Sequence, residues 1–152
     1  KCKKLSGTNT NVKTSMIWGT QYDQVLNWLI KSGEKTPLDI NKGSVAWGNY
    51  PDNEFEYYTN TSKTTATKNL GRGTRIASGA YEGAKANNIY DLAGNVMLWT
   101  LEASSSGSGD NRYYTGGSYS YYGTIVYASG RYYDSSFYSS GGVGFGGRLC
   151  IK

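Results

Sequence analysis

The stretch from Asn87 to Thr100, NNIYDLAGNVMLWT, constrains the fold more than any other part of the chain. A Gly-Asn pair interrupts an otherwise apolar, aromatic run, and both residue types tolerate a positive backbone φ. The side chains of Asn88 and Asp91 can also bond to nearby amides. The stretch therefore predicts a tight turn, held by polar side chains, that leads into a buried strand. A calcium site at Asp91 and Asn95 is the alternative to these structural hydrogen bonds, which we favour.

The composition beyond this stretch disfavours helices. From Ser104 to Lys152, Tyr, Ser and Gly make up 31 of 49 residues, a mixture that suits displayed, adaptable loops better than an ordinary core. At 152 residues we expect one domain, spanning residues 1–152, rather than two. A disordered tail is the alternative for the last third. The apolar residues favour short strands there instead, at Ile125-Val126, Val143, Phe145 and Leu149-Cys150-Ile151.

Helical periodicity occurs once, over about residues 20–32. Apolar residues recur there at the spacing of one helix face, namely Tyr22, Val25, Leu26, Leu29 and Ile30. Thr20 with Asp23 predicts the N-terminal cap, and Lys31-Ser32-Gly33 predicts the end of the helix.

The other elements have weaker signals. A first strand is predicted within Lys1–Lys13 and another at Val45-Ala46-Trp47, whereas the Thr-rich run Thr59–Thr67 is predicted to be a loop. The Gly71-Arg72-Gly73 sequence is predicted to be a plain turn rather than a phosphate site, because a strand-to-helix context is missing.

The chain has no His and only two cysteines, Cys2 and Cys150. Without His, Ser-His-Asp or Cys-His catalysis and the usual zinc and non-haem iron sites are excluded. The acidic residues are scattered, so a pair of catalytic carboxylates is not expected either. Cys2 and Cys150 would close nearly the whole chain if they form a disulfide, and two reduced thiols are an equal alternative.

The formal net charge of +5 is spread thinly along the chain. No basic cluster is denser than Lys1-Cys2-Lys3-Lys4, so we expect no nucleic-acid partner. We also expect no membrane insertion, because no apolar run is long enough. Since the chain opens on Lys1, we expect an excised or processed piece of a longer protein.

Several segments occur in a characteristic order. Tyr90-Asp91, Gly94-Asn95-Val96 and Trp99 are followed by Gly-Gly-Ser at 116–118, Ala-Ser-x-Arg at 128–131 and Gly-Gly-Arg-Leu at 146–149. Together they resemble the formylglycine-generating-enzyme subgroup of the C-type lectin fold. The chain departs from that family at Met97-Leu98, where Trp-Glu is usual, and at Thr115, where Arg is common. The resemblance implies an α+β fold with mixed short strands, one or two helices and much loop.

The chemistry of that family is not expected in this chain. Its oxidase members bind copper through two nearby C-terminal cysteines, whereas this chain has only Cys150 there. Its iron-dependent members need His ligands, and the E-P-N, Q-P-D and W-N-D segments of calcium-dependent sugar-binding lectins are absent. We therefore expect neither an enzyme nor a cofactor. An oxidoreductase of the sulfatase-modifying type and a constitutive glycan-binding lectin stay as alternatives.

The non-catalytic branch of the family offers a better resemblance, to the variable proteins of diversity-generating retroelements. Those proteins display a hypervariable C-terminal surface, which mutation at adenines diversifies, mostly in AAY asparagine codons. Changing the first two bases of AAY yields Tyr, Ser, Asp, Gly, Thr, Ile, Val, Phe or Ala. These residue types account for every position of Tyr119–Val143 except Arg131, and Lys, Glu, Gln, Met and Trp, which AAY cannot reach, are absent there.

The resemblance implies that residues 119–143 form a variable ligand-binding region. Tyr offers wide amphipathic contact at low entropic cost, and Ser adapts to different partners. The expected contact residues are Tyr119, Tyr121, Tyr122, Ile125, Tyr132, Tyr133, Asp134, Ser135, Ser136, Phe137, Tyr138 and Ser139. The alternative is that some of them, with Tyr119 and Tyr127 foremost, are core aromatics on strand faces.

The remaining expectations follow from this assignment. Gly116, Gly117, Arg131 and Arg148 are assigned to the scaffold. We expect the partner to be a protein or cell-surface ligand, and the protein to be extracellular, on a phage virion or on a bacterial cell surface.

Overall fold

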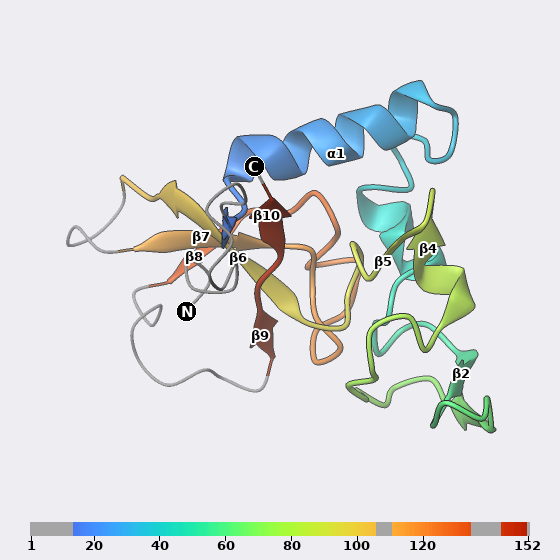
Figure 1. Cartoon of the computed structure of the whole chain (residues 1–152). Coiled ribbons are helices and arrows are strands. Elements are labelled where there is room, and N and C mark those ends of the chain that lie inside the picture. Colours follow the sequence, from blue (N-terminus) through green and yellow to red (C-terminus); the bar gives the residue numbers. More distant parts are fainter. Residues whose placement is uncertain (1–13, 106–110, 135–143, 152) are drawn as a thin grey trace.

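A computed structural model describes residues 14–105, 111–134 and 144–151. Over these residues the chain has an α+β structure with one α-helix, several small sheets and much loop (Figure 1). The strand predicted within Lys1–Lys13, the expected contacts Ser135–Ser139 and Val143 lie outside the described residues. Among the described residues, no helix is long and apolar enough to cross a membrane.

The predicted helix is confirmed as α1, Gly19–Lys31. It buries Tyr22, Leu26 and Leu29 of the apolar stripe, and Val25 and Ile30 are partly buried. Gly33 follows at φ +76°, as the predicted stop requires.

The predicted N-terminal cap of this helix is wrong. The helix begins one residue before Thr20, and the backbone N–H of Trp18 donates to the side-chain oxygen of Gln21 at 2.9 Å. The Asp23 carboxylate pairs instead with Arg131. The Asp23 side chain, which the local sequence assigned to the cap, thus forms a tertiary ion pair instead.

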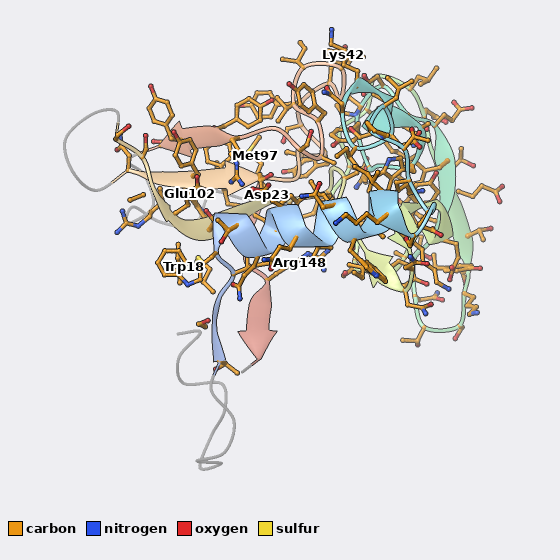
Figure 2. The ribbon with its side chains drawn as sticks, turned by 90° about the horizontal axis from the view of Figure 1, so that it is seen from above. Trp18, Asp23, Lys42, Met97, Glu102 and Arg148 are labelled. Carbon is orange, nitrogen blue, oxygen red and sulfur yellow. The ribbon has the colours of Figure 1, made fainter. Side chains whose placement is uncertain are left out.

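The largest sheet has four strands in the order β8-β7-β6-β9. Its members are β6 (Met97–Ala103), β7 (Arg112–Thr115), β8 (Tyr132–Asp134) and β9 (Phe145–Gly146). Strand β7 is antiparallel to both β6 and β8, and β9 is parallel to β6. Helix α1 lies along one side of this sheet (Figures 1 and 2).

The first and last described strands are neighbours. Strand β1 (Thr14–Met16) pairs antiparallel with β10 (Leu149–Ile151), so Ser15 lies opposite Cys150. The predicted strand at residues 149–151 is therefore confirmed. Cys2, the other cysteine of the possible disulfide, lies outside the described residues.

The remaining elements are short. They are the hairpin strands β2 (Phe55–Tyr58) and β3 (Thr65–Lys68), the pair β4 (Lys85–Ala86) and β5 (Ile89–Tyr90), and the 3₁₀ helices η2 (Lys42–Ala46) and η3 (Glu82–Ala84).

The structure corrects three of the sequence predictions for short segments. The strand predicted at Val45–Trp47 is wrong, because η2 occupies most of it and the Trp47 indole donates to the Asp39 carbonyl oxygen at 2.8 Å. The loop predicted at Thr59–Thr67 ends early, since its last residues belong to β3. The strand predicted at Ile125-Val126 is wrong, because both residues lie in a turn.

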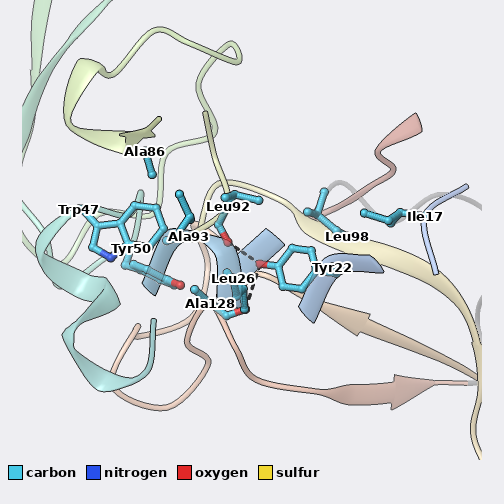
Figure 3. Close-up of a cluster of buried hydrophobic side chains, with 11 residues drawn as sticks. Ile17, Tyr22, Leu26, Trp47, Tyr50, Ala86, Leu92, Ala93, Leu98 and Ala128 are labelled. Atoms are coloured by element: carbon cyan, nitrogen blue, oxygen red, sulfur yellow. Dashed lines mark hydrogen bonds between the residues drawn. The ribbon is translucent and has the colours of Figure 1, made fainter. Parts of the chain in front are cut away.

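The main core joins α1 to the stretch that opened the sequence analysis. Its buried members include Tyr22 and Leu26 of the helix, Tyr50, Leu92 and Leu98 (Figure 3). The Tyr22 hydroxyl shares its hydrogen bond between two carbonyl oxygens, of Leu92 at 2.8 Å and of Ala128 at 3.0 Å (Figure 3). The core thereby reaches residue 128, inside the predicted variable region.

Candidate ligand-binding surface

The turn at Asp91–Asn95 has the predicted construction. Asp91, Gly94 and Asn95 all have positive φ, at 57°, 72° and 59°. The Asn95 side chain accepts a hydrogen bond from the Ile76 amide and donates one to the Ile76 carbonyl oxygen, at 3.2 and 3.1 Å. Leu92 and Ala93 between them are buried. Polar side chains therefore hold a tight turn that leads into β6, as the sequence predicts.

The Asp91 carboxylate accepts structural hydrogen bonds, which the sequence analysis favoured over a calcium site. Its Oδ2 accepts hydrogen bonds from the Ser78 hydroxyl at 2.6 Å and from the Gly79 amide at 3.3 Å. Over the described residues, no three or more acidic, Cys or His side chains are grouped as a metal site would require. Asp91 and Asn95 thus bond to residues 76–79 of a neighbouring segment.

This turn holds the start of the predicted variable region. The Gly94 amide donates to the Gly116 carbonyl oxygen at 2.5 Å, and the Tyr119 amide donates to the Asn95 carbonyl oxygen at 2.9 Å. Gly116 and Gly117 have φ of 91° and 73°, which favours glycine at both positions. A Cβ on Gly117 would also lie 2.5 Å from the Tyr50 ring. These contacts agree with the scaffold role assigned to the two glycines.

Residues 123–130 alternate between buried positions and positions open to solvent. Gly123, Val126, Ala128 and Gly130 are buried, whereas Thr124 and Ile125 are exposed and Tyr127 and Ser129 are partly buried. Backbone contacts fix the buried positions: the Gly123 amide donates to the Asp52 carboxylate at 3.0 Å, and the Thr115 hydroxyl donates to the Ala128 carbonyl oxygen at 3.2 Å. The backbone of this segment is therefore anchored independently of its outward side chains.

Three of the expected contact residues form one exposed group, which we call the 121–125 patch. Tyr121, Tyr122 and Ile125 are 54%, 52% and 66% exposed, unusual values for such large apolar side chains. The amide of Ile125 donates to the Tyr122 carbonyl oxygen at 3.0 Å, so a turn holds the patch together. Tyr119, just before it, is partly buried and lies on no strand.

The two expected contacts Tyr132 and Tyr133 point to opposite faces of the sheet. Tyr132 lies opposite Tyr114 in the strand register, and their rings stack with centroids 5.8 Å apart. Tyr133 lies opposite Tyr113, with an edge contact at 6.0 Å, and is 50% exposed. Successive strand residues alternate between faces, so these two side chains cannot contribute to one flat contact surface.

Tyr132 belongs with the 121–125 patch. Its hydroxyl donates to the Ile125 carbonyl oxygen at 2.8 Å. On the same face, the Trp99 ring packs edge-on against Tyr114 at 5.3 Å and stacks on Phe145 at 5.0 Å. Burial raises the pKa of the Tyr114 and Tyr132 hydroxyls above the usual value. Tyr132 is therefore a half-buried support at the rim of the patch, and Asp134, also partly buried, follows it on β8.

Arg131 fixes the other end of the segment. Its guanidinium bonds to the Glu102 carboxylate of β6 at 2.5 Å, to the Gly19 carbonyl oxygen at 3.2 Å and to the Asp23 carboxylate. Figure 2 shows Asp23 and Glu102 side by side near the start of α1. Arg148 bonds to the Tyr90 carbonyl oxygen, and burial lowers the pKa of its guanidinium. Both arginines thus have the contacts of scaffold residues.

Sequence reasoning missed Asp52, whose carboxylate accepts a hydrogen bond from the Gly123 amide, as described above. The turn predicted at residues 71–73 lies at residues 69–72, where the Arg72 amide donates to the Asn69 carbonyl oxygen at 3.3 Å, and a Cβ on Gly73 would lie 2.6 Å from the Tyr119 carbonyl oxygen. The same turn carries Leu70, which is 63% exposed.

No protein-family model, curated protein or solved structure matches this chain. A functional proposal therefore depends on the residues and geometry described above.

Proposed function

We propose that this chain is a C-type lectin-like domain of the formylglycine-generating-enzyme type that binds a protein or cell-surface ligand without catalysis. In this proposal a diversity-generating retroelement varies residues 119–143, and the ligand contacts centre on the 121–125 patch. The observation that carries the proposal is the separation of roles along one segment. Exposed Tyr121, Tyr122 and Ile125 surround a backbone whose anchors, Gly123 and Val126, are buried.

This separation has a physical advantage for a diversified surface. A replacement at an exposed position changes the folding free energy by only about 0.5 kcal/mol, whereas a buried replacement costs several times more. Large aromatic side chains on a fixed backbone also lose little conformational entropy on binding. A segment built in this way tolerates many sequences and presents each of them in a preorganised form.

The coding DNA and its genomic neighbourhood test the proposal. We expect a near-copy of the DNA for residues 119–143 beside a reverse-transcriptase gene, with differences only where the copy has adenine. We expect those differences at the codons of Tyr121, Tyr122, Ile125 and Tyr133, and none at the codon of buried Ala128. Without such a copy, or with differences concentrated at buried codons, diversification would be rejected and a constitutive binding domain would replace it.

The two rival functions make different predictions. An oxidoreductase of the sulfatase-modifying type would bind copper and oxidise a cysteine-containing peptide, and the Cys150→Ser change would abolish that turnover. A constitutive glycan-binding lectin would select sugars on a glycan array, and a calcium chelator would release them if the binding needs calcium. We expect neither turnover nor sugar selection.

A further inference from the structure

A hollow lies beside the β2–β3 hairpin, away from the 121–125 patch. Its volume is about 160 Å³, and its lining includes Glu56, Tyr57 and Tyr58 of β2 together with Tyr81 and Glu82. In the view of Figure 1, β2 and β8 lie at opposite ends of the molecule. Neither the sequence motifs nor the proposed ligand surface assigns a role to this place.

The walls of the hollow are held by a small core of their own. The Tyr58 amide donates to the Ala80 carbonyl oxygen at 2.8 Å, which joins the hairpin to the segment that follows Ile76. The Tyr81 ring stacks on Phe55, with centroids 3.9 Å apart and an interplanar angle of 13°. Phe55, Ile76 and Ala80 are buried together beneath them. The two sides of the hollow are therefore fixed in position before any ligand arrives.

The chemistry of the lining favours a cation. The tyrosines Tyr57, Tyr58 and Tyr81 are part of the lining, and the faces of tyrosine rings attract ammonium and guanidinium groups. Glu56 and Glu82 add two carboxylates, and the Tyr90 hydroxyl donates to Glu82 Oε2 at 3.1 Å, which orients that carboxylate. Three aromatic rings with two carboxylates form an acidic, aromatic site on a chain whose net charge is +5.

Two lysines of the chain lie over tyrosine rings in or near the hollow. The Lys63 ammonium lies 5.4 Å from the centroid of the Tyr58 ring, and the Lys85 ammonium lies 5.9 Å from the centroid of the Tyr90 ring. Lys63 lines an adjoining hollow that shares Tyr58 and Ala80 with the first. The Tyr58 ring is thus accessible to an ammonium group, and Lys63 is a built-in competitor for it.

We propose that this hollow binds the cationic side chain of a lysine or arginine from a protein partner. Its volume is below the roughly 300–1,000 Å³ of sites that take whole small molecules, so a single side chain fits it better. The carboxylates of Glu56 and Glu82 neutralise the incoming charge, and the tyrosine rings contact its alkyl stem. The site is independent of the 121–125 patch and of the diversification proposed for it.

The test is a titration of the ¹⁵N-labelled chain with N-acetyl-lysine-N′-methylamide, followed by NMR. We expect saturable amide shifts at residues 56–58 and 80–83, and about a tenth of that affinity or less for the uncharged N-acetyl-norleucine-N′-methylamide. The double change Glu56→Gln and Glu82→Gln should weaken binding about fivefold or more. The matched control Glu34→Gln, which removes an exposed carboxylate elsewhere, should leave the affinity unchanged.

A second variant is expected to bind the lysine derivative more tightly than the parent. The change Lys63→Asn removes the competing ammonium and keeps a residue type that tolerates the φ of 59° at this position. It should tighten binding about twofold to fivefold. Retained dispersion of the NMR spectrum would show that each variant is folded. The proposal is overturned if the shifts fall elsewhere, if norleucine binds equally well, or if the glutamine variants bind as the parent does.

Discussion

The Tyr119 amide donates a hydrogen bond to the Asn95 carbonyl oxygen at 2.9 Å. This bond ties the first residue of the predicted variable region to the turn that dominates the sequence pattern. Asn95 in turn is bonded through its side chain to Ile76 and to Asn49. In the function that we propose, this motif is therefore the support of the contact surface and not the contact surface itself.

The Gly94→Ala change should strongly lower the free energy of unfolding. Its φ is +72°, and a Cβ there would lie 2.3 Å from the Asn49 carbonyl oxygen, in fixed backbone. Gly71 is a matched control, because its φ is +76° and nothing lies within 4 Å of its Cβ position. In urea unfolding, Gly71→Ala should cost about 1–2 kcal/mol, and Gly94→Ala at least about 2 kcal/mol more. Equal costs would contradict the close packing of this turn against Asn49.

The free energy of unfolding should fall at high pH because the Tyr22 hydroxyl is buried between the helix and the predicted variable region. Burial raises the pKa of the Tyr22 and Tyr50 hydroxyls far above the ordinary value. Above about pH 10 the unfolded tyrosines ionise while the folded ones keep their protons, so the free energy of unfolding falls as the pH rises. Each buried tyrosine contributes a slope of up to about 1.4 kcal/mol per pH unit, and none of it below pH 9.

The Tyr22→Phe change isolates this contribution. Urea unfolding between about pH 9 and pH 11.5 should show a shallower loss of stability in the variant than in the parent, by up to about 1.4 kcal/mol per pH unit. At neutral pH the variant should be less stable by about 1–3 kcal/mol. The carbonyl oxygen of Leu92 loses the Tyr22 donor, whereas that of Ala128 keeps the Thr115 hydroxyl. Parallel pH profiles for the two proteins would mean that Tyr22 is not buried as described.

Tyr132 and Tyr133 should differ in their effects on stability although they are adjacent. Tyr132 stacks on Tyr114 and donates to the Ile125 carbonyl oxygen, so Tyr132→Ala should cost about 2–3 kcal/mol. Tyr133 is half exposed and has an edge contact with Tyr113, so Tyr133→Ala should cost about 1 kcal/mol or less. Chemical denaturation of the two variants checks this order. The reverse order would mean that the strand register of β8 is wrong.

The sequence could predict elements with a clear period or a demanding turn. The stripe of α1 located the helix to within one residue, because the periodicity is sustained over several turns. The polar turn at Asp91–Asn95 followed from residue types that tolerate positive φ. Both signals are local, and tertiary contacts reinforce them rather than oppose them.

Other features could not be predicted because distant residues determine them. A short apolar run such as Val45–Trp47 fits a strand as well as a turn, and the indole bond of Trp47 to Asp39 decides for the turn. Three of the four residues of strand β3 are polar, and Thr65 and Thr67 are exposed, so only its pairing with β2 reveals it. In the candidate surface, the residue types of Tyr132 and Tyr133 are identical, and only the register of β8 against β7 assigns them to opposite faces.

The most direct measurement of the central idea compares two libraries displayed on yeast. One randomises the exposed positions Tyr121, Tyr122 and Ile125, and the other randomises the buried positions Gly123, Val126 and Ala128 of the same segment. The fraction of members that resist protease at the level of the parent is counted in each. We expect most members of the exposed library to resist and few members of the buried library. Equal fractions would contradict the separation between an exchangeable surface and a fixed support.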